Sequence, residues 1–304
     1  MVKHTGPPLR KDNSAHGSLP NCFEEGTVPA LEKMCVCRNG WHGDECSIPD
    51  VVWSNRRFQE WFSRGLIKRR SKPRLIINGF VFNHELDLLE IRVRELGDAV
   101  DYYVICESNY TFFGTTKPLY LQSNLSAGFL REHAHKILPL TVGVFNYGDG
   151  NPWAPENYFR TSIWHRGQSK LKHLLRDDDL FMIADADEIP NRDVLLFLKH
   201  HDGYGEPVAV SLRWFLYGFF WENRKPVVVG GACTVAFLRH VYENDPLRLR
   251  RADKYATRNL SNTRTQQQRW TIKGTPPLYA GWHCSWCFDA HGIQVSILYF
   301  QVYR

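Results

Sequence analysis

The sequence lacks any apolar run long enough to cross a lipid bilayer. A membrane-spanning helix needs about 18 or more apolar residues in succession, and the nearest candidate, residues 227–238, is too short. The first 20 residues are polar and have no apolar core of a secretion signal, and their Lys, Ser, Pro and Gly content predicts a disordered stem. The chain also has no internal repeat, which excludes solenoid architectures.

The net charge of +6 is not accompanied by an RNA- or DNA-binding motif, so we expect no nucleic acid partner. Part of this charge comes from the basic run 68–74, which we interpret as a solvated linker. A basic surface would suit an anionic ligand such as a nucleotide diphosphate. The 304 residues, 43% of them hydrophobic, are enough for one large globular domain and a small one.

Short apolar runs alternate with helical patterns along most of the chain. Helices are predicted after Asn83, which suits an N-cap, up to Gly97, which suits a C-terminal cap, and near 155–175 and 192–200. A strand, a helix and a strand in succession imply a parallel pair with a right-handed crossover, so the pattern predicts an α/β fold. The predicted strands are residues 74–82, 102–107, 136–140, 180–184 and 208–216.

The most informative segment joins the apolar run 180–184 to a cluster of carboxylates. Asp185, Asp187 and Glu188 follow the run, and Pro190 ends it. Open α/β sheets bind their ligands at the C-terminal ends of the strands. Two aspartates one residue apart at such an end can share one divalent cation, which prefers oxygen ligands and leaves room for substrate phosphates. The alternative interpretation is a solvated acidic turn.

Four cysteines near the N-terminus, together with Gly40, Trp41 and Gly43, resemble the C-terminal half of an EGF-like module. So small a unit needs disulfides to stay folded. The resemblance implies the bridges Cys37–Cys46 and Cys22–Cys35. A zinc site is the weaker alternative, because the spacing of these four cysteines is not that of paired Cys-x2-Cys ligands.

The cysteines indicate the secretory pathway. Three N-glycosylation acceptors, at Asn109, Asn124 and Asn259, favour the same compartment. Nothing in the first residues given would direct the chain there, so we expect the sequence to be incomplete at its N-terminus.

Several motifs together resemble glycosyltransferase family 17, over roughly residues 35–288. In that family an Asp-Asp-Ala-Asp-Glu-Ile-Pro motif stands where this chain has residues 184–190, with Ala184 in place of the first aspartate. The Asp185 and Asp187 spacing is kept. The sequence after Phe288 departs from the family, so we expect part of the acceptor side to be missing. The other matching segments are residues 82–92, 100–109, 111–112, 117–118, 216–221 and 280–288.

This resemblance implies a GT-A-like nucleotide-sugar-binding domain with a mainly parallel sheet. The expected organisation is a disordered stem (1–20), a partial EGF-like segment (21–48), a linker (49–73), the glycosyltransferase domain (74–288) and a divergent tail (289–304). Members of the family are expected to be type II membrane proteins of the Golgi lumen, with an N-terminal anchor that is not visible in this chain.

The resemblance also implies the reaction: inverting transfer of GlcNAc from UDP-GlcNAc, in β1,4 linkage, to the core β-mannose of an N-glycan on a glycoprotein. Asp187 is expected to hold a divalent metal, Mn²⁺ or Mg²⁺, which stabilises the leaving UDP. Asp185 would lie beside it, on the ribose or on a metal-bound water. His283 is a candidate third metal contact or, alternatively, a core histidine between two tryptophans. Glu107 could face the nucleoside or be structural.

Other roles stay open in the sequence. The general base that deprotonates the acceptor hydroxyl is Asp245 or Glu188, of which the second would sit closer to the metal. Cys284 could be bridged locally to Cys287 or either of them to Cys233. The run of aromatic residues at 217 and 219–221 could form a platform for the acceptor sugar or belong to the core.

Three alternatives compete with this function. The chain could be an EGF-like secreted binding protein with an inert α/β domain. It could be a phosphotransferase or phosphohydrolase with an aspartate nucleophile, although Ile189 stands where such sites place a threonine. It could also be a truncated relative of the transferase that has lost its activity.

Overall fold

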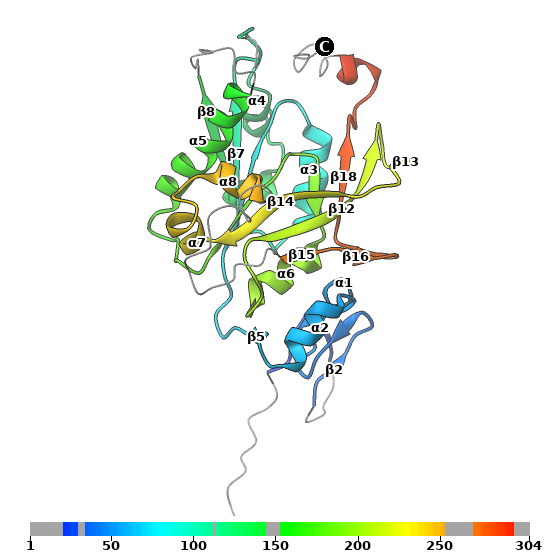
Figure 1. The fold of residues 1–304 in the computed structure, drawn as a ribbon. Helices are drawn as coiled ribbons and strands as arrows, with labels where there is room; N and C mark the ends of the chain where they lie inside the picture. The colour runs from blue at the N-terminus through cyan, green and yellow to red at the C-terminus, as the bar shows by residue number, and fades with distance from the viewer. Residues whose placement is uncertain (1–20, 30–33, 112–113, 144–152, 253–269, 295–304) are drawn as a thin grey trace, which may run out of the picture. The chain divides into compact units, whose positions relative to one another are not determined.

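The computed structural model describes residues 21–29, 34–111, 114–143, 153–252 and 270–294. Three predicted features lie outside these residues: the disordered stem 1–20, the glycosylation acceptor at Asn259, and residues 295–304 of the divergent tail. The chain divides into two compact units, residues 1–47 and 48–304, which are drawn in Figure 1.

The first unit is a small module cross-linked by two disulfides. Cys22 is bonded to Cys35, and Cys37 is bonded to Cys46, which confirms both pairings. So little chain cannot bury a large apolar core, so its stability depends on these bonds. Its strands are β1 (Thr27–Val28), β2 (Val36–Cys37), which pairs antiparallel with β1, and β3 (Trp41–His42).

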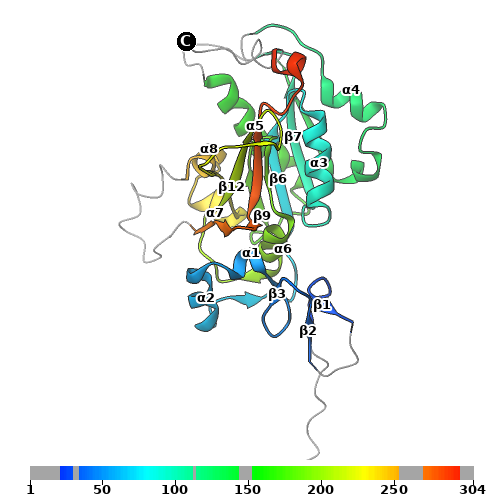
Figure 2. The same ribbon diagram turned by 90° about the vertical axis from the view of Figure 1, so that its right-hand side faces the viewer.

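The second unit is built around a sheet that has ten strands in the described part of the chain. The main path through it is β10-β18-β12-β14-β9-β6-β7-β8, and β13 and β15 also pair with β12; Figures 1 and 2 show it from two sides. The ten strands are β6 (Ile76–Val81), β7 (Tyr102–Ser108), β8 (Ile137–Val142), β9 (Leu180–Ile183), β10 (Glu188–Pro190), β12 (Val208–Leu216), β13 (Trp221–Glu222), β14 (Val227–Thr234), β15 (Trp270–Ile272) and β18 (Gly281–Ser285).

Helices and short strands surround this sheet. The α-helices are α1 (Asp50–Trp53), α2 (Arg56–Ser63), α3 (Leu86–Leu96), α4 (Tyr120–Ser126), α5 (Ala154–Leu171), α6 (Arg192–His200), α7 (Val235–His240) and α8 (Pro246–Arg250), and a 3-10 helix covers Arg131–Lys136. The short strands are β4 (Ile48–Pro49), β5 (Lys68–Arg69) paired with β11 (His201–Asp202), and β16 (Gly274–Thr275) paired with β17 (Leu278–Tyr279). No helix within the described residues is both long enough and apolar enough to cross a membrane.

Strands β9, β6, β7 and β8 are parallel neighbours, and β12 also pairs in parallel with β15 and β18. The pairing of β6 with β7 through α3 confirms the strand–helix–strand unit. Parallel neighbours end at the same edge of a sheet, and here Gly79 of β6 stands opposite Ile183 at the end of β9. The segments that follow β6 and β9 therefore start side by side.

The sheet as a whole is mixed, so a mainly parallel sheet is not confirmed. Strand β14 runs antiparallel to both β9 and β12, and β10 runs antiparallel to β18. A short connection reverses the direction of the chain, whereas a parallel pair needs a long crossover. Only residues 217–226, which include the short strand β13, separate β12 from β14, so these two strands pair as antiparallel neighbours.

Helices α5 and α3 cover opposite faces of the parallel strands, as Figure 2 shows. Successive side chains of a strand point to opposite faces. Gly79 faces α5, and a Cβ at this position would lie 2.3 Å from Ile163 Cγ2, so the glycine allows the helix to approach closely. Its neighbours Asn78 and Phe80 face α3, where both contact the buried side chain of Arg92.

Residues 49–73, which the sequence analysis interpreted as a linker, contain α1, α2 and β5. The buried ring of Phe58 packs edge-on against Phe197 of α6 at a centroid distance of 5.2 Å. The basic run is not wholly solvated, contrary to expectation. Arg74 is buried and pairs with Asp202, and Arg70 pairs with Asp202 and Asp178. These acidic partners come from distant segments, so the local sequence does not show them.

The predicted N-cap of α3 is also wrong. The helix begins at Leu86, with Glu85 at the N-cap position. The side chain of Asn83 instead lies 2.8 Å from His84 Nδ1. The predicted C-terminal cap is confirmed, because Gly97 ends the helix with a φ of 44°, a conformation that glycine adopts readily.

Candidate functional site

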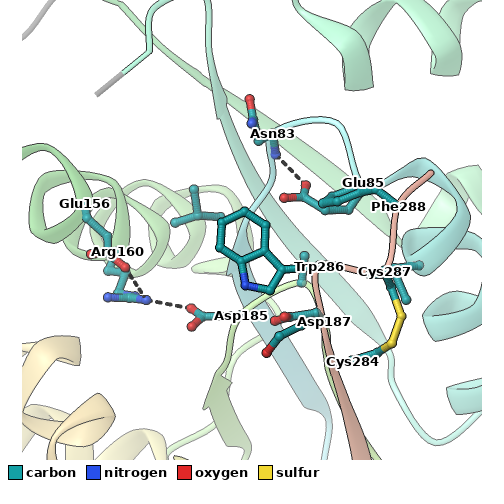
Figure 3. A pocket seen from close by; sticks show the side chains of 14 residues that line it. Asn83, Glu85, Glu156, Arg160, Asp185, Asp187, Cys284, Trp286, Cys287 and Phe288 are labelled. Atoms are coloured by element: carbon teal, nitrogen blue, oxygen red, sulfur yellow. Dashed lines mark hydrogen bonds and ion pairs between the residues drawn. A yellow bond between two sulfur atoms is a disulfide. The ribbon is translucent and has the colours of Figure 1, made fainter. Parts of the chain in front are cut away.

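A pocket of about 320 Å³ lies where the segments after β6 and β9 meet. The register of these two parallel strands places both segments at one edge of the sheet, the position at which open α/β sheets bind ligands. Figure 3 shows the pocket from close by. Its lining side chains are Val81, Asn83, Glu85, Leu88, Glu156, Arg160, Asp185, Ala186, Asp187, Cys284, Ser285, Trp286, Cys287 and Phe288.

Strand β18 brings a histidine to Asp187 from almost a hundred residues away. His283 stands opposite Glu188 in the antiparallel pair of β18 and β10. Its Nε2 lies 3.0 Å from Asp187 Oδ2 and 2.9 Å from Ser285 Oγ. Burial alone would lower the pKa of His283, but its hydrogen bond to Asp187 and the negative charge there raise it above the ordinary value.

Two arginines hold the carboxylate of Asp185. Arg160 Nη2 donates to Oδ1 and Arg250 Nη2 donates to Oδ2, each at 2.6 Å. Burial would raise the pKa of Asp185, but the positive charges of Arg250 and Arg160 outweigh it and lower the pKa to about 2. Asp185 is therefore an anion at any physiological pH, with both of its oxygens committed to arginine.

Glu188 stabilises the acidic segment, residues 185–188, to which it belongs. Its Oε2 accepts a hydrogen bond from the main-chain nitrogen of Asp185 at 2.8 Å, and both oxygens accept from Arg250. Burial and the neighbouring Asp185 charge raise the pKa of Glu188, and Arg250 opposes them. The residue is buried and does not line the pocket, so these contacts favour a structural role over that of a base.

Arg92 fastens the same segment to α3. The side chain is fully buried. Its Nη1 donates to the main-chain oxygen of Glu188 at 2.7 Å and lies 3.1 and 3.3 Å from those of Asp185 and Ala186. Nε donates to Asn78 Oδ1 at 2.9 Å. Burial lowers the pKa of Arg92 to about 10, which still leaves it charged at neutral pH.

Glu85 faces the acidic segment from the β6 side of the pocket. Its Oε2 accepts hydrogen bonds from the main-chain nitrogens of Asn83 at 2.8 Å and His84 at 3.0 Å. Burial raises the pKa of Glu85, and Asp187 adds to the rise, while the main-chain donors and His84 oppose it. No arginine or lysine within the described residues forms an ion pair with it, unlike Asp185, Glu156 and Glu188.

Trp286 lies across the mouth of the pocket, as the labelled side chains in Figure 3 show. Its φ of 59° is in the left-handed region, which non-glycine residues adopt rarely. A disulfide between Cys284 and Cys287 brackets it. The local bridge is therefore the correct alternative, and Cys233 is a free, buried thiol.

The structure brings together four of the six residues that the sequence suggested. Asp185 and Asp187 line the pocket, and His283 and Glu188 contact them from outside its lining. The other two lie elsewhere. Glu107 accepts hydrogen bonds from the main-chain nitrogens of Leu121 and Gln122 and so fastens the start of α4. Asp245 is the N-cap of α8 and accepts from the main-chain nitrogen of Leu247 at 2.9 Å. Neither of them lines the pocket.

Asp187 and His283 offer a carboxylate oxygen and an imidazole nitrogen side by side. A divalent cation in a nucleotide site is held by one or two protein side chains and by substrate phosphates. This pair would fit Mn²⁺ or Mg²⁺ when a diphosphate supplies the remaining ligands and the cation replaces the hydrogen bonds of His283 Nε2 to Asp187 and Ser285. Asp185 does not fit as a direct ligand in this arrangement, because arginines occupy both of its oxygens. No group of three or more metal-ligating side chains is assembled among the described residues.

Five charged residues of this site were missed by sequence reasoning: Glu85, Arg92, Glu156, Arg160 and Arg250. Only Arg92 had a visible signal. It stands three residues after Leu89 and four before Leu96, on the apolar face of α3, where a charged side chain needs buried partners. The partners of Arg160 and Arg250 come from segments distant in sequence, so their roles depend on the tertiary structure.

Comparison with known proteins gives the site its context. The model of glycosyltransferase family 17 matches residues 45–228. A curated relative from Homo sapiens, named β-1,4-mannosyl-glycoprotein 4-β-N-acetylglucosaminyltransferase, is 42% identical over 315 residues, or 96% of this chain and 57% of the relative. Relatives of the same name from Rattus norvegicus and Mus musculus are 42% identical over 275 residues, or 87% of this chain and 49% of each.

The chain thus spans about half the length of the curated relatives it matches. The family match covers most of the sheet, from β6 through β9 to β12. It also covers both pocket segments with acidic side chains, the one after β6 with Glu85 and the one after β9 with Asp185 and Asp187. Both the extent of this match and the identity to the relatives place the chain in glycosyltransferase family 17.

Proposed function

We propose that the chain binds UDP-GlcNAc at this pocket and transfers GlcNAc to O4 of the β-linked core mannose of an N-glycan, with inversion at the anomeric carbon. The name of the relatives supports the sugar, the linkage and the mannosyl-glycoprotein acceptor. The observation that carries the proposal is the meeting of Asp187 and His283 at the carboxyl edge of the sheet. No observation favours the secreted binding protein or the phosphotransferase.

In this proposal Asp187 and His283 hold a divalent cation, Mn²⁺ or Mg²⁺. When bound, the cation would act as a Lewis acid that stabilises the leaving UDP. Arg160, which lines the pocket, places positive charge beside the diphosphate. Asp185 keeps Arg160 and Arg250 oriented through its two ion pairs, and this indirect role replaces the direct metal contact.

Glu85 is the substrate-facing carboxylate in this proposal. A carboxylate that no cationic side chain neutralises can accept a hydrogen bond or a proton from a substrate hydroxyl. Asp245 and Glu188 stay untested as candidate bases, and their present contacts, a helix cap and an internal ion pair, favour structural roles.

The finer architecture is also part of the proposal. We assign residues 74–288 to a GT-A-like domain, 21–48 to an EGF-like segment, 1–20 to a stem and 289–304 to a tail. The whole protein would act in the Golgi lumen as a type II membrane protein. Family membership and the disulfides support this location, because disulfides form and persist in the secretory pathway.

Transfer can be tested with the 304-residue chain, UDP-GlcNAc, Mn²⁺ and a biantennary N-glycan. We expect a product heavier by one N-acetylhexosamine, with linkage analysis placing it on O4 of the core mannose. Asp187→Asn should abolish the product, while Asp177→Asn, an exposed carboxylate paired only with Arg239, should not. Product formed equally well by Asp187→Asn and by the wild-type chain would contradict the proposal, as would a folded wild-type chain that neither forms the product nor binds UDP in the presence of Mn²⁺.

A further inference from the structure

The turn between β12 and β13 exposes a cluster of aromatic side chains. Tyr217 is 59% exposed, Phe219 42%, Phe220 90% and Trp221 69%. Folding normally removes such rings from water, because their burial is strongly favourable. Adjacent rings exposed in this way are typical of a binding surface. The sequence left open whether this run is core or platform, and its exposure favours the platform.

A second cavity, of about 410 Å³, opens beside this turn. Glu95 of α3 and Arg213 of β12 are its charged members, and the other members are apolar or aromatic. Rings with a few fixed polar groups are the usual lining of a ligand site. The lining side chains are Ile91, Glu95, Ile189, Arg213, Phe215, Phe219 and Trp282.

Arg213 is held in place before any ligand arrives. Its Nε donates to Glu222 Oε1 at 2.7 Å and its Nη2 donates to Glu222 Oε2 at 2.5 Å, a bidentate pair. The guanidinium also lies over the ring of Tyr279, 4.1 Å from the centroid. A planar ion pair fixed in this way can exchange hydrogen bonds with neighbouring hydroxyl groups at little entropic cost.

This combination fits a sugar better than a lipid or an apolar helix. A pyranose ring presents an apolar C–H face to an aromatic ring and a rim of hydroxyls to planar charged groups. A wholly apolar occupant would instead strip water from Arg213 and Glu222 without replacing its hydrogen bonds. The two charges are opposite in sign, so they do not favour an ionic ligand.

The cavity is close to the pocket that holds Asp187. Leu88, which lines the pocket, and Ile91 and Glu95, which line the cavity, lie on the same helix α3. On β18, Cys284 lines the pocket and Trp282 lines the cavity. Two residues along a strand span roughly 7 Å, so nearby positions of β18 reach both sites.

A shared wall joins the two sites. The buried side chains of Leu88, Phe215 and Cys284 pack together, with Trp282 against them. Trp214, the neighbour of Phe215 on β12, stacks on the ring of His283 with centroids 6.1 Å apart. The strand that carries the aromatic turn therefore also supports the imidazole beside Asp187.

We propose that the aromatic turn and the adjoining cavity form a second carbohydrate-binding subsite, which holds a sugar of the N-glycan acceptor away from the hydroxyl that reacts. This inference rests on the proposed function, because it takes the pocket at Asp187 as the place of transfer. It assigns the affinity for an extended glycan to rings outside that pocket.

The test is direct binding of glycans to the 304-residue chain, measured without donor by saturation-transfer NMR and calorimetry. The probes are a biantennary N-glycan and the disaccharide mannosyl-β1,4-GlcNAc. The variants are the double substitution Phe220→Ala/Trp221→Ala and the single substitution Arg213→Lys, which keeps the charge but loses the planar fork. Tyr158→Ala, an exposed ring on α5 that lines neither site, is the matched control.

We expect the double variant to bind the biantennary glycan about tenfold or more weakly, since each lost ring contact removes a sizeable share of binding energy. Arg213→Lys should weaken it as well, and Tyr158→Ala should not. Affinity for the disaccharide and for UDP should stay unchanged in all variants, and circular dichroism should show an intact fold.

Unchanged affinity of the double variant for the biantennary glycan would overturn the inference, as would no glycan binding by the wild-type chain or an equal loss for the disaccharide. If the proposed function fails instead, the chain would bind no UDP, while the glycan could still bind at the aromatic turn. The two failures therefore give distinct results.

Discussion

Arg92 donates a hydrogen bond from Nη1 to the main-chain oxygen of Glu188 at 2.7 Å and thereby joins α3 to the segment that carries Asp185 and Asp187. The same nitrogen lies close to the oxygens of two further residues in that segment. The guanidinium is fully buried, so these acceptors have no water to replace it. The position of Asp187 in the pocket thus depends on a side chain that never reaches the pocket.

Replacing Arg92 by leucine should destabilise the fold and weaken nucleotide binding together. The change leaves several buried acceptors without a donor, and each such group costs about 1–3 kcal/mol, so we expect a loss of at least about 3 kcal/mol in the free energy of unfolding. Urea unfolding measures it. Arg94→Leu on the same helix removes only exposed pairs with Glu90 and Glu132 and should change the free energy of unfolding far less, because exposed ion pairs contribute little. Similar losses in both variants would show that Arg92 has no special role.

Replacing Arg250 by methionine should leave two carboxylates without their main counter-charge. Arg250 pairs with Asp185 and with the buried Glu188. Removing one partner of a buried ion pair costs about 3–5 kcal/mol, and we expect a loss in that range by urea unfolding at pH 7. Arg248→Met, on the same short helix, breaks contacts with the more exposed Glu243 and Asp245. It should change stability by less than about 1 kcal/mol, and a loss as large as that of Arg250→Met would refute the account.

His201 should make stability depend on pH below neutrality. The ring is buried and stacks on Phe197, and burial lowers its pKa to about 4. In the unfolded chain the pKa is about 6.5. The unfolded state therefore takes up a proton first as the pH falls, so the contribution of the neutral ring to stability is complete above about pH 6.5 and is lost progressively towards pH 4.

Unfolding in urea at pH 7, 6 and 5 tests this directly. Between pH 7 and pH 5 the wild-type chain should lose about 2 kcal/mol more than His201→Phe, because each pH unit below the unfolded pKa costs up to about 1.4 kcal/mol. His165→Phe, at an exposed position of α5, should keep the wild-type dependence. Parallel curves for the wild type and His201→Phe would mean that the pKa of His201 is the same in the folded and unfolded states.

The elements that could be predicted from the sequence are those with strong local patterns. Strand β12 and helix α6 coincide with the predicted ranges 208–216 and 192–200. Strand β12 is an apolar run that follows Pro207, and helix α6 is capped by Asn191. Neighbouring residues therefore indicate where both elements begin. The place of β14 in the sheet could not be predicted in this way: its short connection to β12 indicates an antiparallel pair, but its pairing with β9 joins segments that are distant in sequence.

The residues of the candidate site also divide into those with a local sequence pattern and those that depend on long-range packing. Asp185 and Asp187 are visible from their place after a buried strand. The meeting of His283 with Asp187 was suggested by family resemblance alone, since pairing of β18 with β10 is a long-range event. The counter-charges of Asp185 escaped prediction because an arginine in a helical pattern normally faces solvent, and only the packing of α5 and α8 turns Arg160 and Arg250 towards it.

The central claim is that Asp187 and His283 form a metal-dependent site for a nucleotide diphosphate. The most direct test is calorimetric titration of UDP into the 304-residue chain, with Mn²⁺ and again with a chelator in its place. We expect binding at least about tenfold tighter with Mn²⁺, a difference of about 1.4 kcal/mol or more. Asp187→Asn should lose that difference, and Asp177→Asn should keep it. Equal UDP affinity with Mn²⁺ and with the chelator in the wild-type chain, or an undiminished metal effect in Asp187→Asn, would contradict the account.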